Sequence, residues 1–205
     1  MNSKFNLFAV FTFSVFLTGC MSMPISTMYK MSQFSPFDME PKDIRIALRT
    51  NQSIEVKSGA AQIFMSYSSD GNERLPAFYE EHKFNVQVQK IQNAEIPEIL
   101  LDDLEDNEAV TILKLSDSDA QTMKNLLAKA KEYKAQEARG KGEFAISTEN
   151  NCFGNLNNFT SLEVDVFLQA VKEDGYMLFL EDIDVIEEAN NNDIDLQQTN
   201  RCEVG

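Results

Sequence analysis

Residues that commonly carry out catalysis or bind metals are few in this sequence. Its 205 residues include one histidine, His82, and three cysteines, Cys20, Cys152 and Cys202. Zinc sites use several histidine or cysteine ligands, so the single histidine indicates an ordinary side chain at the surface or at a loop edge. The Gly-x-Ser-x-Gly elbow, the glycine-rich phosphate loop and the His-Glu-x-x-His motif are absent from the sequence. We therefore expect a protein that is not an enzyme and that uses neither a cofactor nor a metal ion.

Charged side chains are numerous but are not arranged as a known site. The chain has 33 Asp and Glu against 18 Lys and Arg, a net charge of −15. The acidic cluster at 102–106 lacks the ordered spacing and central glycine of a calcium loop, which indicates a solvated loop. Arg45 and Arg49 point outward together from an alternating segment; they suit a bound carboxylate or phosphate, but in so acidic a chain we prefer ion pairs with neighbouring acids. Because an acidic surface repels phosphate backbones, nucleic acid is not an expected partner.

Methionines and phenylalanines are concentrated between residues 21 and 41. This segment holds five of the nine methionines and no glycine. Thioethers bind soft ions such as Cu(I), but no histidine accompanies these methionines and their spacing is irregular. We therefore expect the segment to pack on the domain or on a membrane surface.

The first 19 residues have the three parts of an export signal: a positive charge at Lys4, an apolar run at 7–17, and small residues before the cleavage point. The apolar run is too short to span a bilayer as a helix, which takes about 20 residues. Leu17, Thr18, Gly19 and Cys20 then resemble the lipobox of bacterial lipoproteins. The alternative is an ordinary cleaved signal followed by a cysteine at that position.

The lipobox resemblance implies that Cys20 is diacylated and becomes the N-terminus, anchoring the chain in a membrane through its lipid. In lipoproteins of this kind, an aspartate directly after the lipidated cysteine resembles a signal for inner-membrane retention. Here the two residues after Cys20 are Met21 and Ser22. The absence of an aspartate favours the outer membrane, at its periplasmic face or at the cell surface. The segment 23–49 is also similar to uncharacterised lipoproteins of proteobacteria, a similarity that implies no activity.

The same resemblance bears on the other two cysteines. If Cys20 carries lipid, Cys152 and Cys202 remain in an exported, oxidising environment, and a disulfide between them is expected. It would close a loop of about 50 residues and stabilise the fold by about 4 kcal/mol. Two unpaired thiols or an intermolecular bridge are the alternatives.

Alternating apolar residues predict strands and one long helix. The strands are expected at 43–50, 60–68, 83–91, 109–115, 144–148, 162–168 and 176–185, the last two joined by an Asp-Gly turn at 174–175. The helix is expected from Ser116, where Asp119 completes a capping box, to about Ala138, with Gly140 just beyond its end. Its apolar stripe consists of Ala120, Met123, Leu126, Leu127, Ala130 and Tyr133.

These patterns indicate an α+β fold: a mainly antiparallel sheet of six to seven strands, with 109–115 central, and one long helix packed on one face. The expected organisation is a lipoprotein signal peptide at 1–19, an acylated N-terminus and Met/Phe-rich tether at 20–41, and a single domain at 42–205 whose polar C-terminal tail is tied by the disulfide. The favoured function is a non-catalytic protein of the bacterial envelope that binds a protein partner. The alternative is a small-molecule or lipid-binding module with an apolar groove near the Met/Phe-rich segment.

Overall fold

A computed structural model describes residues 37, 39–90, 95–148, 152–154, 156 and 159–191. The export signal, the lipobox with Cys20, and Cys202 lie outside these residues. The predictions made for them therefore stay predictions. The end of the Met/Phe-rich segment is described, and there Met39 is 5% exposed within the main core. This part of the segment packs on the domain, as expected.

The described residues form an α+β fold in which every strand pairing is antiparallel. This confirms the predicted class. The strands are β1 (Arg45–Asn51), β2 (Glu55–Val56), β3 (Ala61–Ser69), β4 (Phe78–Asn85), β5 (Gln87–Val88), β6 (Glu108–Lys114), β7 (Gly140–Thr148), β8 (Phe153–Gly154), β9 (Glu163–Gln169) and β10 (Met177–Asp184). The helices are α2 (Asp117–Ala135) and α3 (Val185–Asn191), and the 3-10 turns are η2 (Pro41–Asp43), η4 (Glu98–Leu100) and η7 (Lys172–Asp174).

The strands are divided among three sheets, so the prediction of one sheet of six to seven strands was wrong in this respect. One sheet has the order β10-β9-β1-β6-β5, the second has β4-β3-β7, and β2 pairs with β8. The central strand of the largest sheet is β1 rather than β6. Alternation along a strand shows which face is buried, but it does not show which strand is the neighbour.

The expected strand at 83–91 is in fact two strands that belong to different sheets. β4 starts at Phe78 and pairs with β3, whereas β5 pairs with β6. Between the two strands, the backbone N–H of Val86 donates a hydrogen bond to the Ala61 carbonyl, and the Val86 carbonyl accepts one from the backbone N–H of Gly59. The apolar alternation continues through Phe84 and Val86, which are both buried, because the chain passes from one sheet to the other without leaving the core.

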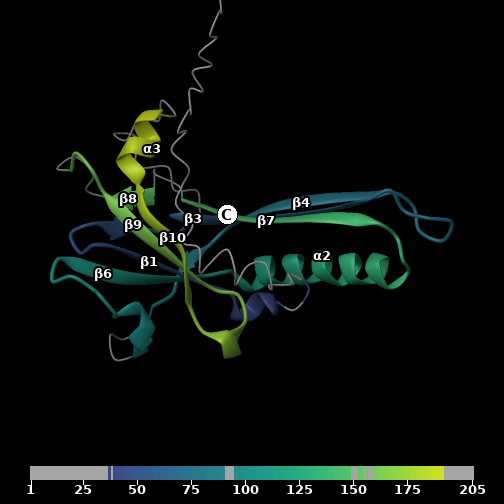
Figure 1. Ribbon diagram of the computed structural model, residues 1–205, viewed down its shortest axis with the longest axis horizontal. Helices are drawn as coiled ribbons and strands as arrows, with labels where there is room; N and C mark the ends of the chain where they lie inside the picture. Colours follow the sequence, from purple (N-terminus) through teal and green to yellow (C-terminus); the bar gives the residue numbers. More distant parts are fainter. Residues whose placement is uncertain are drawn as a thin grey trace, which may run out of the picture.

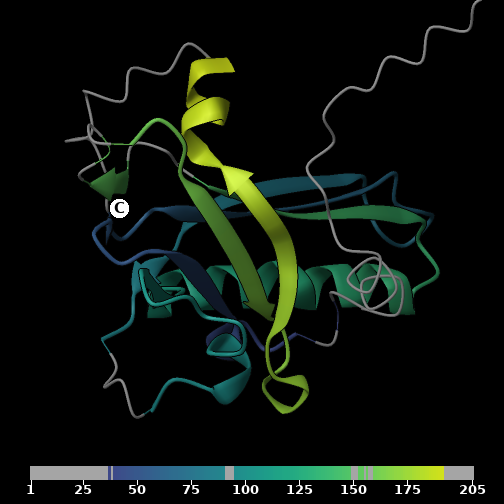
Figure 2. The same cartoon turned by 60° about the vertical axis from the view of Figure 1, so that its left-hand side comes forward.

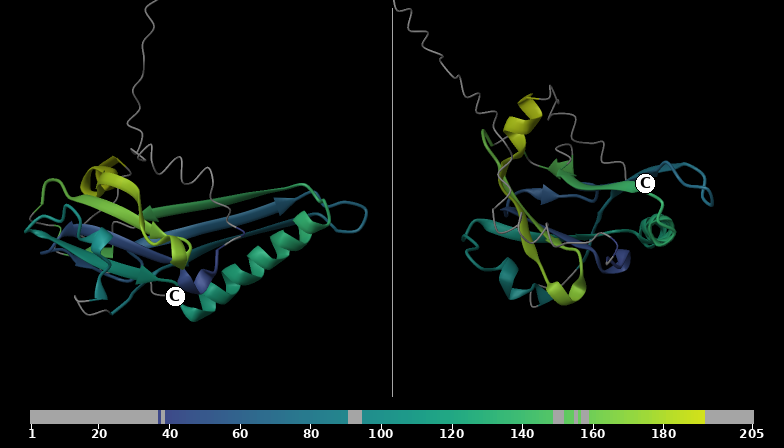
Figure 3. Two further views of the ribbon diagram at one scale, coloured as in Figure 1. Left: turned by 60° about the horizontal axis from the view of Figure 1, so that its bottom comes forward. Right: turned by 45° about the vertical axis from the view of Figure 1, so that its right-hand side comes forward.

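Helix α2 covers the three-stranded sheet along much of its length (Figures 1 and 3). All six residues of the predicted apolar stripe are buried. The Ser116 hydroxyl accepts a hydrogen bond from the backbone N–H of Asp119 at 3.0 Å, which confirms the predicted cap. The helix ends at Ala135, three residues early, because Glu137 takes a left-handed conformation (φ 58°) and Gly140 already belongs to β7.

The C-terminal hairpin was predicted correctly, with β9 and β10 joined through η7 and Gly175, whose φ of 68° suits glycine. Figure 2 shows these two long strands side by side with α3 at the end of β10. The first part of the expected polar C-terminal tail, up to Asn191, belongs to the helix α3. That stretch is helical because Asp184 caps it and because Val185, Ile186 and Ala189 are buried.

Candidate functional site

An apolar cleft lies between helix α2 and the strands β3 and β7. Its volume is about 330 Å³, at the lower end of the range usual for small-molecule pockets. It is lined by Phe37, Met65, Ser66, Tyr67, Leu127, Ala130, Lys134, Ala138, Gly140, Gly142 and Glu143. Phe37 comes from the Met/Phe-rich segment, so the cleft lies where the predicted apolar groove was expected.

Two glycines of β7 shape one wall of the cleft. A Cβ at Gly140 would meet the Tyr67 hydroxyl at 2.2 Å and its ring at 2.5 Å, so only glycine fits beside this ring. A Cβ at Gly142 would have its nearest contact at 3.6 Å, an ordinary van der Waals distance. At Gly140 the Tyr67 ring lies where a side chain would be, whereas at Gly142 a Cβ would make ordinary contacts with the Ser66 carbonyl and the Tyr67 ring.

The side chains around the cleft combine an apolar wall with two opposite charges. On the helix side, Leu127 and Ala130 are buried, and Met65 is buried on the sheet side. The Lys134 ammonium lies 4.6 Å from the centre of the Phe37 ring, a cation–π contact. Glu143 also lines the cleft. An apolar chain with a polar end group would therefore find a dry wall and charged groups beside it.

Behind the cleft, three aromatic rings link helix and sheet. Tyr67 lies 6.4 Å from Tyr133, and Phe78 lies 5.4 Å from Tyr133, measured between ring centres. The Tyr133 hydroxyl donates to the Pro76 carbonyl at 3.0 Å, and Lys129 lies 3.6 Å above the Phe78 ring. Burial, with a smaller contribution from Tyr133, raises the pKa of Tyr67. The cleft thus has a fixed back wall of packed rings.

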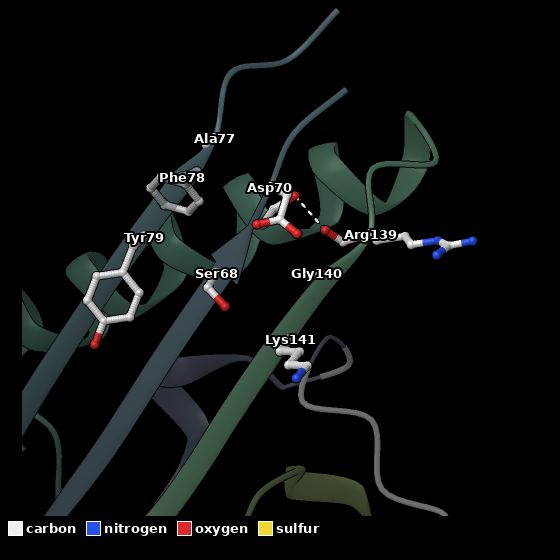
Figure 4. A pocket seen from close by; sticks show the side chains of 9 residues that line it. Ser68, Asp70, Ala77, Phe78, Tyr79, Arg139, Gly140 and Lys141 are labelled. Atoms are coloured by element: carbon white, nitrogen blue, oxygen red, sulfur yellow. Dashed lines mark hydrogen bonds between the residues drawn. The ribbon is translucent and has the colours of Figure 1, made fainter. Parts of the chain in front are cut away.

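A larger hollow of about 960 Å³ lies at the far end of the three-stranded sheet. Its polar groups do not converge on one point: in Figure 4 the Arg139 side chain extends away from the strands, and Tyr79 lies on the opposite side. The Tyr79 hydroxyl is already bonded to Glu81. The dashed line in Figure 4 is the bond from the Ser69 hydroxyl to the Arg139 carbonyl, 2.6 Å, which fixes the backbone. We therefore regard this hollow as a weaker candidate than the cleft.

The two arginines of β1 have separate roles. Arg49 donates to Asp165 from Nη2 at 2.7 Å and from Nε at 3.1 Å, and also to the Asp102 carbonyl at 2.7 Å. This confirms the preferred ion pairing for Arg49. Arg45 instead donates to the backbone carbonyls of Lys42 and Ile44, at 2.7 and 2.8 Å. They do not form a joint anion site.

His82 lies inside β4 rather than at a loop edge, opposite Met65 of β3. Its Nε2 is 2.7 Å from a Glu80 carboxylate oxygen, and its ring stacks on Phe84 at 5.6 Å. The side chain is about one-third exposed. Within the part of the chain that the structure describes, no group of three or more histidine, cysteine or acidic residues is placed to hold a metal ion.

Of the residues predicted to be modified, only Cys152 is described. It is buried beside Gly59, where a Cβ on the glycine would lie 3.4 Å from its sulfur. Lipidation of Cys20 and pairing of Cys152 with Cys202 remain predictions, because Cys20 and Cys202 are outside the described residues. No helix within the described ranges is long and apolar enough to cross a bilayer.

Comparison with protein-family models, curated proteins and solved structures found no match to this chain. The assignment of the cleft as a candidate site therefore depends on its geometry in this structure. Sequence reasoning expected the Met/Phe-rich segment, which includes Phe37, to line an apolar groove, but it did not identify the wall residues contributed by α2, β3 and β7. The signal that could have located the wall is the Gly-Lys-Gly triplet at 140–142, which removes two side chains from one face of a strand.

Proposed function

We propose that this chain is an outer-membrane lipoprotein, anchored through lipid on Cys20, whose folded part binds an apolar small molecule or a lipid acyl chain in the cleft beneath α2. The observation that carries the ligand proposal is the cleft of about 330 Å³ with the buried apolar side chains of Met65, Leu127 and Ala130 in its wall. The anchor rests on the leader sequence. The wall formed by Met65, Leu127 and Ala130 is apolar, and the role that we propose is binding rather than catalysis.

The shape and charge of the cleft favour a slender chain with an anionic head group. Burial of each CH₂ contributes about 0.8 kcal/mol, which corresponds to about fourfold in affinity. Lys134 lies at the exposed face of α2 beside the cleft, where an ammonium group can pair with a carboxylate. Because such an exposed pair contributes about 0.2–1 kcal/mol, the head group increases the affinity about 1.4- to fivefold.

The experiment is calorimetric titration of the mature chain, carrying Cys20→Ser, with dodecanoate and decanoate. Dodecanoate should bind more than tenfold more tightly than decanoate. Gly142→Val should weaken binding at least tenfold, because its side chain occupies the space of the ligand. Ser147→Val, on an exposed position of the same strand, is the matched control and should leave binding unchanged. Equal loss in both variants, or no dependence on chain length, would contradict the proposal.

Lys134 gives a separate test of the head group. Lys134→Gln should weaken dodecanoate binding about 1.4- to fivefold and leave dodecanol binding unchanged. Lys131→Gln, on the neighbouring exposed surface of α2, is the control. An equal effect of Lys134→Gln on both ligands would refute a role for its charge.

The second candidate function is binding of a protein partner. Ile99 and Leu101 are 46% and 42% exposed on either side of the buried Leu100, and Asp102 and Asp103 follow at the surface. An apolar pair beside carboxylates favours a partner surface that is apolar and basic. A photo-crosslinker at position 99 should capture one partner from intact cells in a salt-dependent manner, and a crosslinker at Gln121 should not. Recovery of only the protein itself and lipid at position 99 would argue against this function.

A further inference from the structure

A polar cavity of about 340 Å³ opens on the face of the five-stranded sheet opposite the main core. It lies between β1, β6 and β9 and the turns η4 and η7, which appear in teal and yellow-green toward the lower side of Figures 1 and 2. Ile112 of β6 lines it and belongs to a small separate apolar cluster with Leu100 and Tyr176. The cavity is independent of the cleft beneath α2, with which it shares no lining residue.

Two neutral polar groups line this cavity. Within the part of the chain that the structure describes, the side-chain oxygen Oε1 of Gln89 is buried and accepts no hydrogen bond. Tyr176, whose side chain ends in a hydroxyl, is only 6% exposed. Leaving a buried polar group unpaired costs about 1–3 kcal/mol, so such groups call for a specific partner. The unpaired Gln89 oxygen and Tyr176 line the same cavity.

The cavity is lined by two positive and two negative side chains, so that their charges cancel. These side chains are less buried than Gln89 Oε1 and Tyr176. Arg45 and Lys172 carry positive charge, and Asp43 and Glu95 carry negative charge. Lys172 and Glu95 are exposed, and Arg45 and Asp43 are partly buried. A charged ligand group that reached Gln89 and Tyr176 would be buried against neutral partners, which is unfavourable. A hydroxyl group can donate to Gln89 Oε1 and bond to Tyr176 without burying charge.

We propose that this cavity is a binding site for a small neutral, hydroxyl-rich ligand of the saccharide class. One ligand hydroxyl donates to Gln89 Oε1 and a second one pairs with the Tyr176 hydroxyl, while Arg45 and Asp43 contact hydroxyls nearer the opening. Tyr176 can act as a donor, because a tyrosine hydroxyl is protonated at neutral pH. Burial raises its pKa further, to about 12, a shift that the nearby Arg45 opposes.

The test is a nuclear magnetic resonance titration of the full mature chain with glucose, galactose and N-acetylglucosamine, with alanine as a zwitterionic probe. At least one sugar should shift the Gln89 side-chain amide and the Tyr176 ring signals in a saturable way. Tyr176→Phe and Gln89→Met, which keep the shape of the side chains, should each weaken that binding at least tenfold. Gln62→Met, in β3 outside the cavity, should leave it unchanged.

Three results would overturn the proposal. The first is the absence of saturable shifts with all three sugars up to about 100 mM. The second is saturable binding of alanine alone, which would assign the cavity to a zwitterion. The third is sugar binding that survives both Tyr176→Phe and Gln89→Met, which would place the sugar elsewhere. Thermal unfolding of each variant, measured in parallel, separates lost binding from lost folding.

Discussion

Tyr176 makes the stability of the protein depend on pH in the alkaline range. Its pKa in the folded state, raised by burial to about 12, lies above the value of about 10 expected in the unfolded chain. The folded state therefore retains this proton longer than the unfolded state does. The resulting contribution to stability is complete below pH 10 and is lost as the pH rises through about 12.

We predict that, between pH 10 and 12, the unfolding free energy of the natural protein falls about 2–3 kcal/mol further than that of Tyr176→Phe. Urea unfolding at several pH values measures this difference. The pKa values of Tyr67 and Tyr79 are also raised. Because both tyrosines are present in the natural protein and in Tyr176→Phe, their contributions to the difference in unfolding free energy cancel. Parallel curves for the two proteins over this range would contradict the prediction.

The two glycines of β7 should respond in opposite ways to alanine. Gly140→Ala places a methyl group against the Tyr67 ring and the Ser68 carbonyl, and we expect a loss of about 1–3 kcal/mol. Gly142→Ala meets ordinary contacts only and should gain about 0.5–1 kcal/mol, because glycine within a strand is entropically unfavourable. Chemical denaturation measures the change in unfolding free energy of each variant, and each variant serves as the control for the other. Equal changes would refute the packing of Gly140 against Tyr67.

At the scale of single residues, the sequence predicted most side chains whose role follows from local pattern. Ser116 at the helix cap and the pairing of Arg49 with an acid are examples. His82 is about one-third exposed, but its place within a strand was missed, because that strand starts with residues of alternating exposure such as Tyr79 and Glu81. The unpaired Gln89 oxygen could not be predicted, because it depends on distant segments that surround it.

At the scale of elements, the C-terminal end of helix α2 has a less favourable backbone conformation than its N-terminal end. Glu137 adopts φ 58°, a left-handed conformation that costs a side chain about 1 kcal/mol, and it is exposed. Glu137→Gly should therefore raise the unfolding free energy by about 0.5–1 kcal/mol. Lys131→Gly, one turn earlier in the exposed helix interior, should lower it by about 1 kcal/mol. Destabilisation by both substitutions would contradict the assigned helix end.

The short helix α3 depends on Asp184. Partial burial disfavours the charge of Asp184. Hydrogen bonds from Ser161 and from the backbone N–H groups of Leu162, Glu187 and Ile186 outweigh this effect and lower its pKa. Asp184→Ala should cost about 1 kcal/mol at pH 7. Because the folded-state pKa is lowered, this contribution is present above about pH 4 and is lost as the pH falls through the folded-state value.

The measurement for Asp184 is the difference in urea unfolding free energy between the natural protein and Asp184→Ala from pH 7 to pH 2. The difference should shrink toward the acidic end. Glu187→Ala, in the first turn of the same helix, is the control, and its effect should be smaller. A difference that stays constant down to pH 2 would show that the ionised form of Asp184 does not cap α3.

The sequence predicted most elements because their signals are local. The six buried residues of α2 and the hairpin of β9 and β10 follow from periodicity and from an Asp-Gly turn. The early end of α2 was missed because glycine was expected at the left-handed position, and Glu137 occupies it. The short strands β2 and β8 were missed because two-residue strands have no detectable period.

On the scale of the whole molecule, the arrangement of sheets decides where ligands can bind. The chain changes sheet between β4 and β5, so the three-stranded sheet extends away from the five-stranded sheet, with α2 along it (Figure 3). This separation forms the apolar cleft on one sheet and the polar cavity on the other. The residues that line the two sites could not be predicted from sequence as a set, since both sets depend on pairings between residues far apart in the chain, such as β1 with β9.

The most direct test of the proposed function is to locate a bound acyl chain by intermolecular nuclear Overhauser effects. With uniformly ¹³C-labelled dodecanoate and the mature Cys20→Ser chain, the ligand methylene signals should show contacts to the Met65 and Leu127 methyl groups. These contacts should disappear in Gly142→Val and persist in Ser147→Val. Contacts only to residues outside the cleft, or contacts that persist in Gly142→Val, would contradict the proposal that the cleft beneath α2 binds an apolar chain.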